Sequence, residues 1–287
     1  MKLFIHLAVL IVLSNGAALA DQVVRSPLVN KAPNIDGLAD DPAWKNAPMI
    51  ITRDKVAEID IELRTVHSDE SLFFLVRFPD ATEDRRHKTL KWNNSLQAYR
   101  SGFEREDSFV FKWNMEPRPV DLTISSEDSY KADIWYWKSF RTDRAGYADD
   151  KYHLYGPTKH PKSRAVYTRS GKPVFLTRIG DDGQSTYKSQ THAKFVSQRV
   201  DRYVSRQPSG SRADVRAKGL WKNGFWTIEF SRPFKTGHSD DVQFDRSLTY
   251  TFGVSRFEIA GKLPNSKLSQ PLYESGEIGE HITLKWN

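Results

Sequence analysis

Short apolar segments separated by turn-forming residues run along most of this 287-residue chain, and this pattern predicts a protein built from β-strands. Ile59, Ile61 and Leu63 alternate with charged residues, which indicates a strand with one buried and one wet face. The continuous apolar run 72–76 predicts a central strand. The expected strands are 58–66, 71–78, 108–113, 120–125, 132–138, 174–178, 219–221, 225–231, 249–257 and 282–286.

Turn and loop signals complete the expected architecture. Asn223-Gly224 lies between two aromatic segments and predicts a two-residue hairpin turn, because both residues tolerate positive φ. Helix is expected only as a turn near 41–45 and as a polar segment within 84–97. Residues 155–216 are too long and polar for an ordinary connection, so we expect an insertion that is either functional or mobile. The sequence therefore predicts an all-β protein, an antiparallel β-sandwich with a long polar insertion and a few short helices.

The N-terminus has the pattern of a secretory signal. Lys2 precedes an apolar run, and small residues follow up to Ala20, where we expect cleavage. The apolar run is shorter than the ~20 residues that cross a bilayer, so no transmembrane anchor is expected. We therefore predict an exported protein, in a Gram-negative periplasm, with residues 21–287 as a single domain.

Cysteine is absent, which excludes disulfides, thiolate nucleophiles, cysteine-held iron–sulfur clusters and covalently attached haem. The formal net charge is +7, and residues 159–216 contain thirteen Lys or Arg against four Asp. This segment is either a basic face that attracts an acidic partner or a solvated loop. No nucleic-acid partner is expected, because an exported chain seldom meets nucleic acid.

The segment 133–138 concentrates aromatic and charged side chains on one predicted strand. With a two-residue period, Trp135 and Trp137 face one side, while Tyr136 and Lys138 face the other. The two indoles either form a wall that grips a flat ligand or fill the core of the sandwich. The pattern alone does not decide between these interpretations.

Motifs of common enzymes are absent. The chain has no G-x-S-x-G elbow, H-E-x-x-H helix, P-loop or G-x-G-x-x-G, so no catalytic activity of its own is expected. The acid pairs Asp149-Asp150, Asp181-Asp182 and Asp240-Asp241 are expected in loops. Adjacent acids do not easily face one cleft, so these are typical turn residues, although an oxygen-rich loop also suits calcium. His153 and His160 are expected to be solvated loop residues.

Six motifs follow one another along the chain: Ile35-Asp36-Gly37 with Trp44, His67 to Phe73, Glu106-Asp107-Ser108, Asp133 to Lys138 with Arg141, Gly146 to Asp150, and Thr236-Gly237 with Asp240 to Phe244. Together they resemble the haem-binding γ subunit of ethylbenzene dehydrogenase and its relatives. The resemblance spans nearly the whole expected mature chain. An I-D-G motif followed by Trp also opens carbohydrate-binding modules of the related family 9.

The resemblance implies an immunoglobulin-like sandwich that holds one haem b between loops at one end, ligated by a methionine and a lysine. It further implies electron transfer between a redox enzyme and a periplasmic cytochrome. The basic segment 159–216 would then be the docking face for a redox partner with an acidic face. The similar positions for the iron ligands are Met115 and Lys267, with Lys262 in reserve. Those for the haem pocket are Trp135, Tyr136, Trp137, Lys138, Phe140 and Arg141, with Lys138 and Arg141 meeting the propionates.

The alternative is a binding module without redox chemistry. It would stack a sugar or another flat ligand on Trp135, Tyr136 or Trp137 and hold calcium in an acidic loop. The two hypotheses differ in a simple observable, because the haem protein is red and the alternative is colourless.

Overall fold

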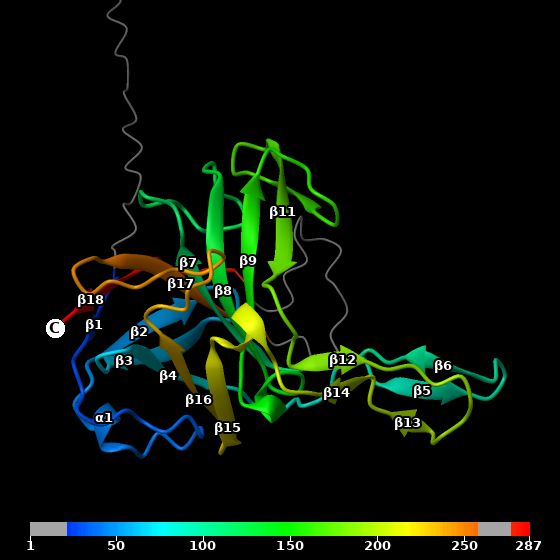
Figure 1. The fold of residues 1–287 in the computed structure, drawn as a ribbon. Helices are drawn as coiled ribbons and strands as arrows, with labels where there is room; N and C mark the ends of the chain where they lie inside the picture. Colours follow the sequence, from blue (N-terminus) through cyan, green and yellow to red (C-terminus); the bar gives the residue numbers. More distant parts are fainter. Residues whose placement is uncertain (1–21, 258–276) are drawn as a thin grey trace, which may run out of the picture.

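A computed structural model describes residues 22–257 and 277–287, in which nearly all regular structure is β-strand (Figure 1). The expected signal segment 1–20, Lys262 and Lys267 lie outside the described residues. An eight-stranded sheet consists, in spatial order, of β1 (Gln22–Ser26), β18 (Ile282–Trp286), β17 (Tyr250–Phe257), β7 (Ser108–Asn114), β8 (Tyr130–Lys138), β9 (Asp149–Gly156), β11 (Pro173–Gly180) and β10 (Arg164–Tyr167).

A five-stranded sheet packs against the inner face of the larger one. Its order is β15 (Arg216–Lys222), β16 (Phe225–Pro233), β4 (Ser71–Pro79), β3 (Ile59–His67) and β2 (Met49–Asp54). The core between the sheets is aromatic: Phe74 of β4 lies with its ring centroid 4.7 Å from that of Phe111 of β7. The predicted β-sandwich is confirmed, and β4 is central, as its continuous apolar run predicts.

Two features of the turns were correctly predicted. Asn223 and Gly224 have φ values of 53° and 78° and join β15 to β16, so that Lys222 pairs with Phe225. A short helix, α1 (Pro42–Lys45), occupies the expected turn near 41–45.

Two expected elements are wrong. Residues 84–97 contain no helix; they contain β5 (Leu90–Asn93) and the turn that leads to β6 (Ala98–Ser101). Residues 120–125 form no strand, because Leu122 is buried as a loop residue over the outer face of the large sheet. The backbone amide of Leu122 donates to the imidazole of His281 at 3.0 Å. In a strand, this amide would donate to the carbonyl of a neighbouring strand instead.

The predicted insertion 155–216 is structured in two parts. Its first part supplies β10 and β11, which extend the eight-stranded sheet. Its second part joins β5 and β6 in an arm that projects from the sandwich (Figure 1). The arm contains β12 (Tyr187–Ser189), β13 (Arg199–Val200) and β14 (Tyr203–Ser205), with the short helix η2 (Gly210–Ala213) following.

The carboxylate of Glu229 in β16 binds the motif formed by Asp36-Gly37 and Trp44. Its buried carboxylate accepts hydrogen bonds from the amide of Asp36 at 3.0 Å, the amide of Gly37 at 2.7 Å and the indole of Trp44 at 2.7 Å. Gly37 has a φ of 85°, and a side chain there would meet the amide nitrogen of Leu220 at 2.9 Å. This motif therefore fixes the N-terminal segment to the smaller sheet.

Candidate functional site

The strand β8 divides its side chains between two environments. Trp135 and Trp137 are both fully buried in the core between the sheets. Tyr136 and Ile134 lie on the outer face of the eight-stranded sheet. The alternation was predicted correctly, and the structure places the indoles as core residues, which is the second of the two interpretations.

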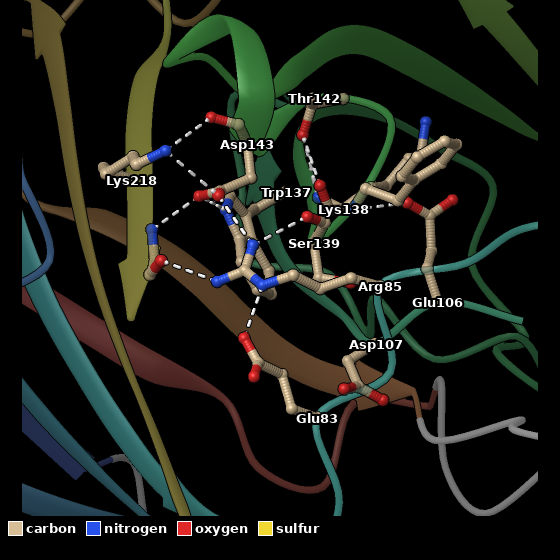
Figure 2. A network of polar contacts seen from close by, with 12 residues as sticks. Glu83, Arg85, Glu106, Asp107, Trp137, Lys138, Ser139, Thr142, Asp143 and Lys218 are labelled. Atoms are coloured by element: carbon tan, nitrogen blue, oxygen red, sulfur yellow. Dashed lines mark hydrogen bonds and ion pairs between the residues drawn. The ribbon is translucent and has the colours of Figure 1, made fainter. Parts of the chain in front are cut away.

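A polar network surrounds the indole of Trp137 at the end of β8 (Figure 2). Asp143, in the short helix η1 (Asp143–Ala145), accepts a hydrogen bond from the Trp137 indole at 2.9 Å and one from the Gly219 amide at 2.6 Å. Its second carboxylate oxygen lies 2.8 Å from Nη1 of Arg85 and 3.2 Å from Nζ of Lys218. The network ties η1 to β15 and holds the indole in a fixed orientation.

Lys138 and Arg141 are already paired with carboxylates of the protein. The ammonium of buried Lys138 donates to Asp149, and the guanidinium of Arg141 donates to Glu106. The same Glu106 accepts from the backbone amides of Phe140 at 2.9 Å and Arg141 at 2.8 Å. Burial lowers the pKa of Lys138. These two cations therefore stabilise the turn after β8 within the described structure.

A cavity of about 280 Å³ opens on the outer face of the eight-stranded sheet, and we call it the sheet-face pocket. It is bounded by strands β7, β8, β9, β11 and β17 and by the segment before β18. Its apolar lining residues are Val110, Ile124, Ile134, Leu176, Phe257 and Ile278. Its polar lining residues are Lys112, Tyr136, Lys151, His153, Arg178, Ser255 and Glu277.

His153 is the pocket residue that the sequence analysis misassigned. It lies on β9, between Ala132 of β8 and Arg178 of β11, and not in a solvated loop. Its Nδ1 atom is buried and has no hydrogen-bond partner in the described structure. Burial lowers the pKa of His153 well below its usual value, and the nearby cations lower it further. The lowered pKa therefore favours the neutral form of the His153 imidazole in the wall of the pocket.

The polar groups around His153 are held in place by hydrogen bonds. The ammonium of Lys112 donates to the Leu122 carbonyl at 2.5 Å and to the Tyr130 hydroxyl at 2.6 Å. Burial lowers the pKa of Lys112 to about 8. Glu277 accepts from the amide of Ile124 at 3.1 Å. The loop 120–125 and the segment before β18 thus close two sides of the pocket.

A family model described as Ethylbenzene dehydrogenase matches residues 39–262. The chain belongs to this family. No curated protein matches the sequence.

Among solved structures, a family 9 carbohydrate-binding module from Caldicellulosiruptor kristjanssonii in complex with glucose is 12% identical. That alignment covers 92% of this chain and 96% of the module, with a TM-score of 0.38. A putative carbohydrate-binding protein from Bacteroides uniformis is 9% identical, with 93% and 99% of the two chains covered and a TM-score of 0.40.

The motifs by which the chain resembles the ethylbenzene dehydrogenase family include several buried hydrogen-bond acceptors. Glu106 binds the turn 140–141, and Asp107 accepts from the indole of Trp226 at 3.1 Å and from the amide of Asp84 at 2.7 Å. These contacts join distant segments of the sandwich. These residues therefore indicate that the chain shares the fold of the family, and they do not identify the ligand that the family binds.

The structure does not bring Met115 close to the expected propionate partners. Met115 directly follows β7 and lines a separate cavity of about 530 Å³. In the register of β7 with β8, Asn114 lies opposite Ala132 and Ser108 lies opposite Lys138. Met115 and Lys138 are therefore at opposite ends of the strand pair, about 20 Å apart at the usual rise per residue.

In the parts of the chain that the structure describes, no helix has the length and apolar character needed to cross a bilayer.

Proposed function

We propose that this member of the ethylbenzene dehydrogenase family is an exported, non-catalytic protein that binds haem b in the sheet-face pocket. The observation that carries the proposal is the His153 imidazole, whose lowered pKa favours its neutral form, among apolar walls and cationic side chains. Neutral imidazole is a common protein ligand of haem iron. The bound haem would supply one-electron redox chemistry, and the protein would pass electrons between a redox enzyme and a periplasmic cytochrome.

The chemistry of the pocket residues fits this group, although the cavity of about 280 Å³ is smaller than a whole porphyrin and would have to widen around it. Ile134, Leu176 and Phe257 offer apolar contacts for a porphyrin ring and exclude water from it. Arg178 supplies positive charge toward propionates, whereas Lys151 pairs with Asp149 at 2.7 Å. A pocket of low polarity also influences the reduction potential of an iron centre.

Lys267 remains the expected second ligand from the resemblance. The segment that contains it, 258–276, is preceded by Phe257 and followed by Glu277, and both of these residues line the sheet-face pocket. Met115, which borders the other cavity, is the weaker candidate of the two. The excess of Lys and Arg in 159–216 supports docking to an acidic redox partner, with association that weakens as salt rises.

The size of the pocket favours a second candidate function. About 280 Å³ lies just below the ~300–1,000 Å³ typical of ligand sites, which suits a small sugar or a small carboxylate. The rings of Tyr136 and Phe257 are stacked with centroids 5.8 Å apart and offer an aromatic surface for such a ligand. In this case the protein would be colourless and would have no redox role.

Haemin titration of the purified chain, followed by visible absorption, separates the two candidates. We expect a saturable shift of the Soret band with one haem per chain. His153→Ala is expected to weaken binding more than ~10-fold, because even changes outside the inner ligand shell commonly cost that much. His160→Ala is the matched control, since His160 lines a different cavity.

Equal haemin affinity in the wild type and His153→Ala would remove His153 from the ligands. The absence of any Soret shift in the wild type, together with saturable binding of a monosaccharide or small carboxylate, would favour the second candidate.

A further inference from the structure

Four aspartates from separate parts of the chain converge between the two sheets. Asp133 lies on β8, Asp150 on β9, Asp181 directly after β11, and Asp241 in the connection between β16 and β17. Carboxylate oxygens of Asp133, Asp150 and Asp241 lie within 4.8 Å of one another. All four residues are buried, with at most 4% of the surface of any one exposed. Like charges packed this closely need compensation.

Arg232 of β16 provides only part of that compensation. This fully buried guanidinium lies 2.8 Å from Asp133 and 3.0 Å from Asp241. Asp133 also accepts the backbone amide of Val242 at 3.0 Å. Arg212 is a second positive charge near Asp181, so two negative charges would remain if all four carboxyl groups were ionised.

The carboxylate groups of two of the aspartates have no hydrogen-bond partner within the described structure. Neither carboxylate oxygen of Asp150 is hydrogen bonded, although this residue is 0% exposed. Asp181, which is 3% exposed, is in the same situation. Unpartnered buried carboxylates are costly, and proteins normally satisfy them with hydrogen-bond donors or metal ions. The cluster therefore has unused coordination capacity.

We propose that Asp133, Asp150, Asp181 and Asp241 form a calcium-binding site that joins the two sheets. The ligands offered are carboxylate oxygens, which calcium prefers, and six to eight oxygen ligands at flexible geometry suit it. Zinc and copper favour imidazole and sulfur ligands, and magnesium keeps several waters, for which a dry interior is unsuitable. The divalent cation and Arg232 together nearly balance the four carboxylates.

The titration behaviour of the cluster agrees with this assignment. Burial and the neighbouring aspartates raise the pKa of Asp181 to about 9. Burial also raises the pKa of Asp133, to about 6, against the effect of Arg232. The crowded negative charge that raises these pKa values is the charge that a bound cation would neutralise.

Adjacent residues of a strand point to opposite faces of the sheet, so the two aspartates of an acid pair have different surroundings. Asp149 and Asp150 begin β9 and do not lie in a loop, which corrects the expectation from sequence. Asp149 points to the outer face and pairs with Lys138, so Asp150 points into the sandwich. Of the next pair, Asp181 is buried and Asp182 is exposed. One member of each acid pair thus enters the cluster.

Calcium titration of the whole chain after EDTA treatment tests the site. Isothermal titration calorimetry with CaCl₂ should show one site per chain, and calcium should raise the melting temperature by several degrees. MgCl₂ should have a smaller effect. Asp150→Asn should abolish the calcium heat and the gain in melting temperature. Its metal-free form should be as stable as the wild type or more so, because a neutral amide replaces a buried carboxyl.

Asp182→Asn is the matched control and should retain full calcium binding, because Asp182 is the exposed neighbour of a proposed ligand. Asp181→Asn gives a second test of the site if Asp150→Asn does not fold. The proposal is overturned if the wild type shows neither calcium heat nor a change in melting temperature, or if both cluster variants bind calcium like the wild type. Neither readout depends on haem.

Discussion

Arg232→Met is expected to lower the free energy of unfolding by about 3–5 kcal/mol, because removing one partner of a buried ion pair leaves charge uncompensated. Arg232 is fully buried and pairs with both Asp133 and Asp241. Urea unfolding in EDTA measures the loss. Arg53→Met is the control: Arg53 pairs with Asp60 on the surface, where such pairs contribute about 1 kcal/mol or less.

The loss in Arg232→Met should shrink as the pH falls below about 6, where Asp133 becomes protonated in the folded state. Burial also raises the pKa values of Asp150 and Asp181, that of Asp181 to about 9, and the partly buried His238 and Asp214 lie beside Asp241. Saturating calcium should reduce the loss as well. A variant as stable as the wild type in EDTA at neutral pH would show that the cluster needs no positive charge.

Trp137→Ala is expected to cost about 3–5 kcal/mol of unfolding free energy, the range observed for large aromatic residues in protein cores. The indole is fully buried, lies with its ring centroid 4.9 Å from that of Trp226, and donates a hydrogen bond to Asp143. Urea unfolding again provides the measurement. Phe103→Ala, at a residue that is 73% exposed, should change the stability by less than about 0.5 kcal/mol.

Trp137→Ala also distinguishes between the two interpretations of the tryptophan pair. If Trp137 serves the core, the folded fraction of the variant should keep its haemin affinity. A large loss of haemin affinity with unchanged stability would instead support the pocket-wall interpretation. Trp137→Phe should recover part of the packing but not the hydrogen bond to Asp143.

Most of the fold could be predicted from the sequence, because strands with one buried face show an alternation of apolar and polar residues. The segments that became β3, β4 and β16 carry that pattern or a continuous apolar run. The strand β9 was missed because it begins with Asp149-Asp150 and carries Lys151 and His153. Its polar side chains are buried by neighbours that are distant in the sequence, which a local pattern does not contain.

The site was less accessible for the same reason. Alternation correctly separated Trp135 and Trp137 from Tyr136, but it did not indicate which face of β8 the second sheet covers. The acid pairs resembled turn residues until β9 and the connection between β16 and β17 brought Asp150 and Asp241 together. His153 is recognisable only through its position between β8 and β11.

The location of the iron in a haemin complex tests the central claim most directly. Crystals grown with haemin and measured at the iron absorption edge should give one anomalous peak in the sheet-face pocket, within bonding distance of a ring nitrogen of His153. A peak beside Met115 in the separate cavity, or an empty sheet-face pocket with iron elsewhere, would contradict the claim that this pocket is the ligand site of the protein.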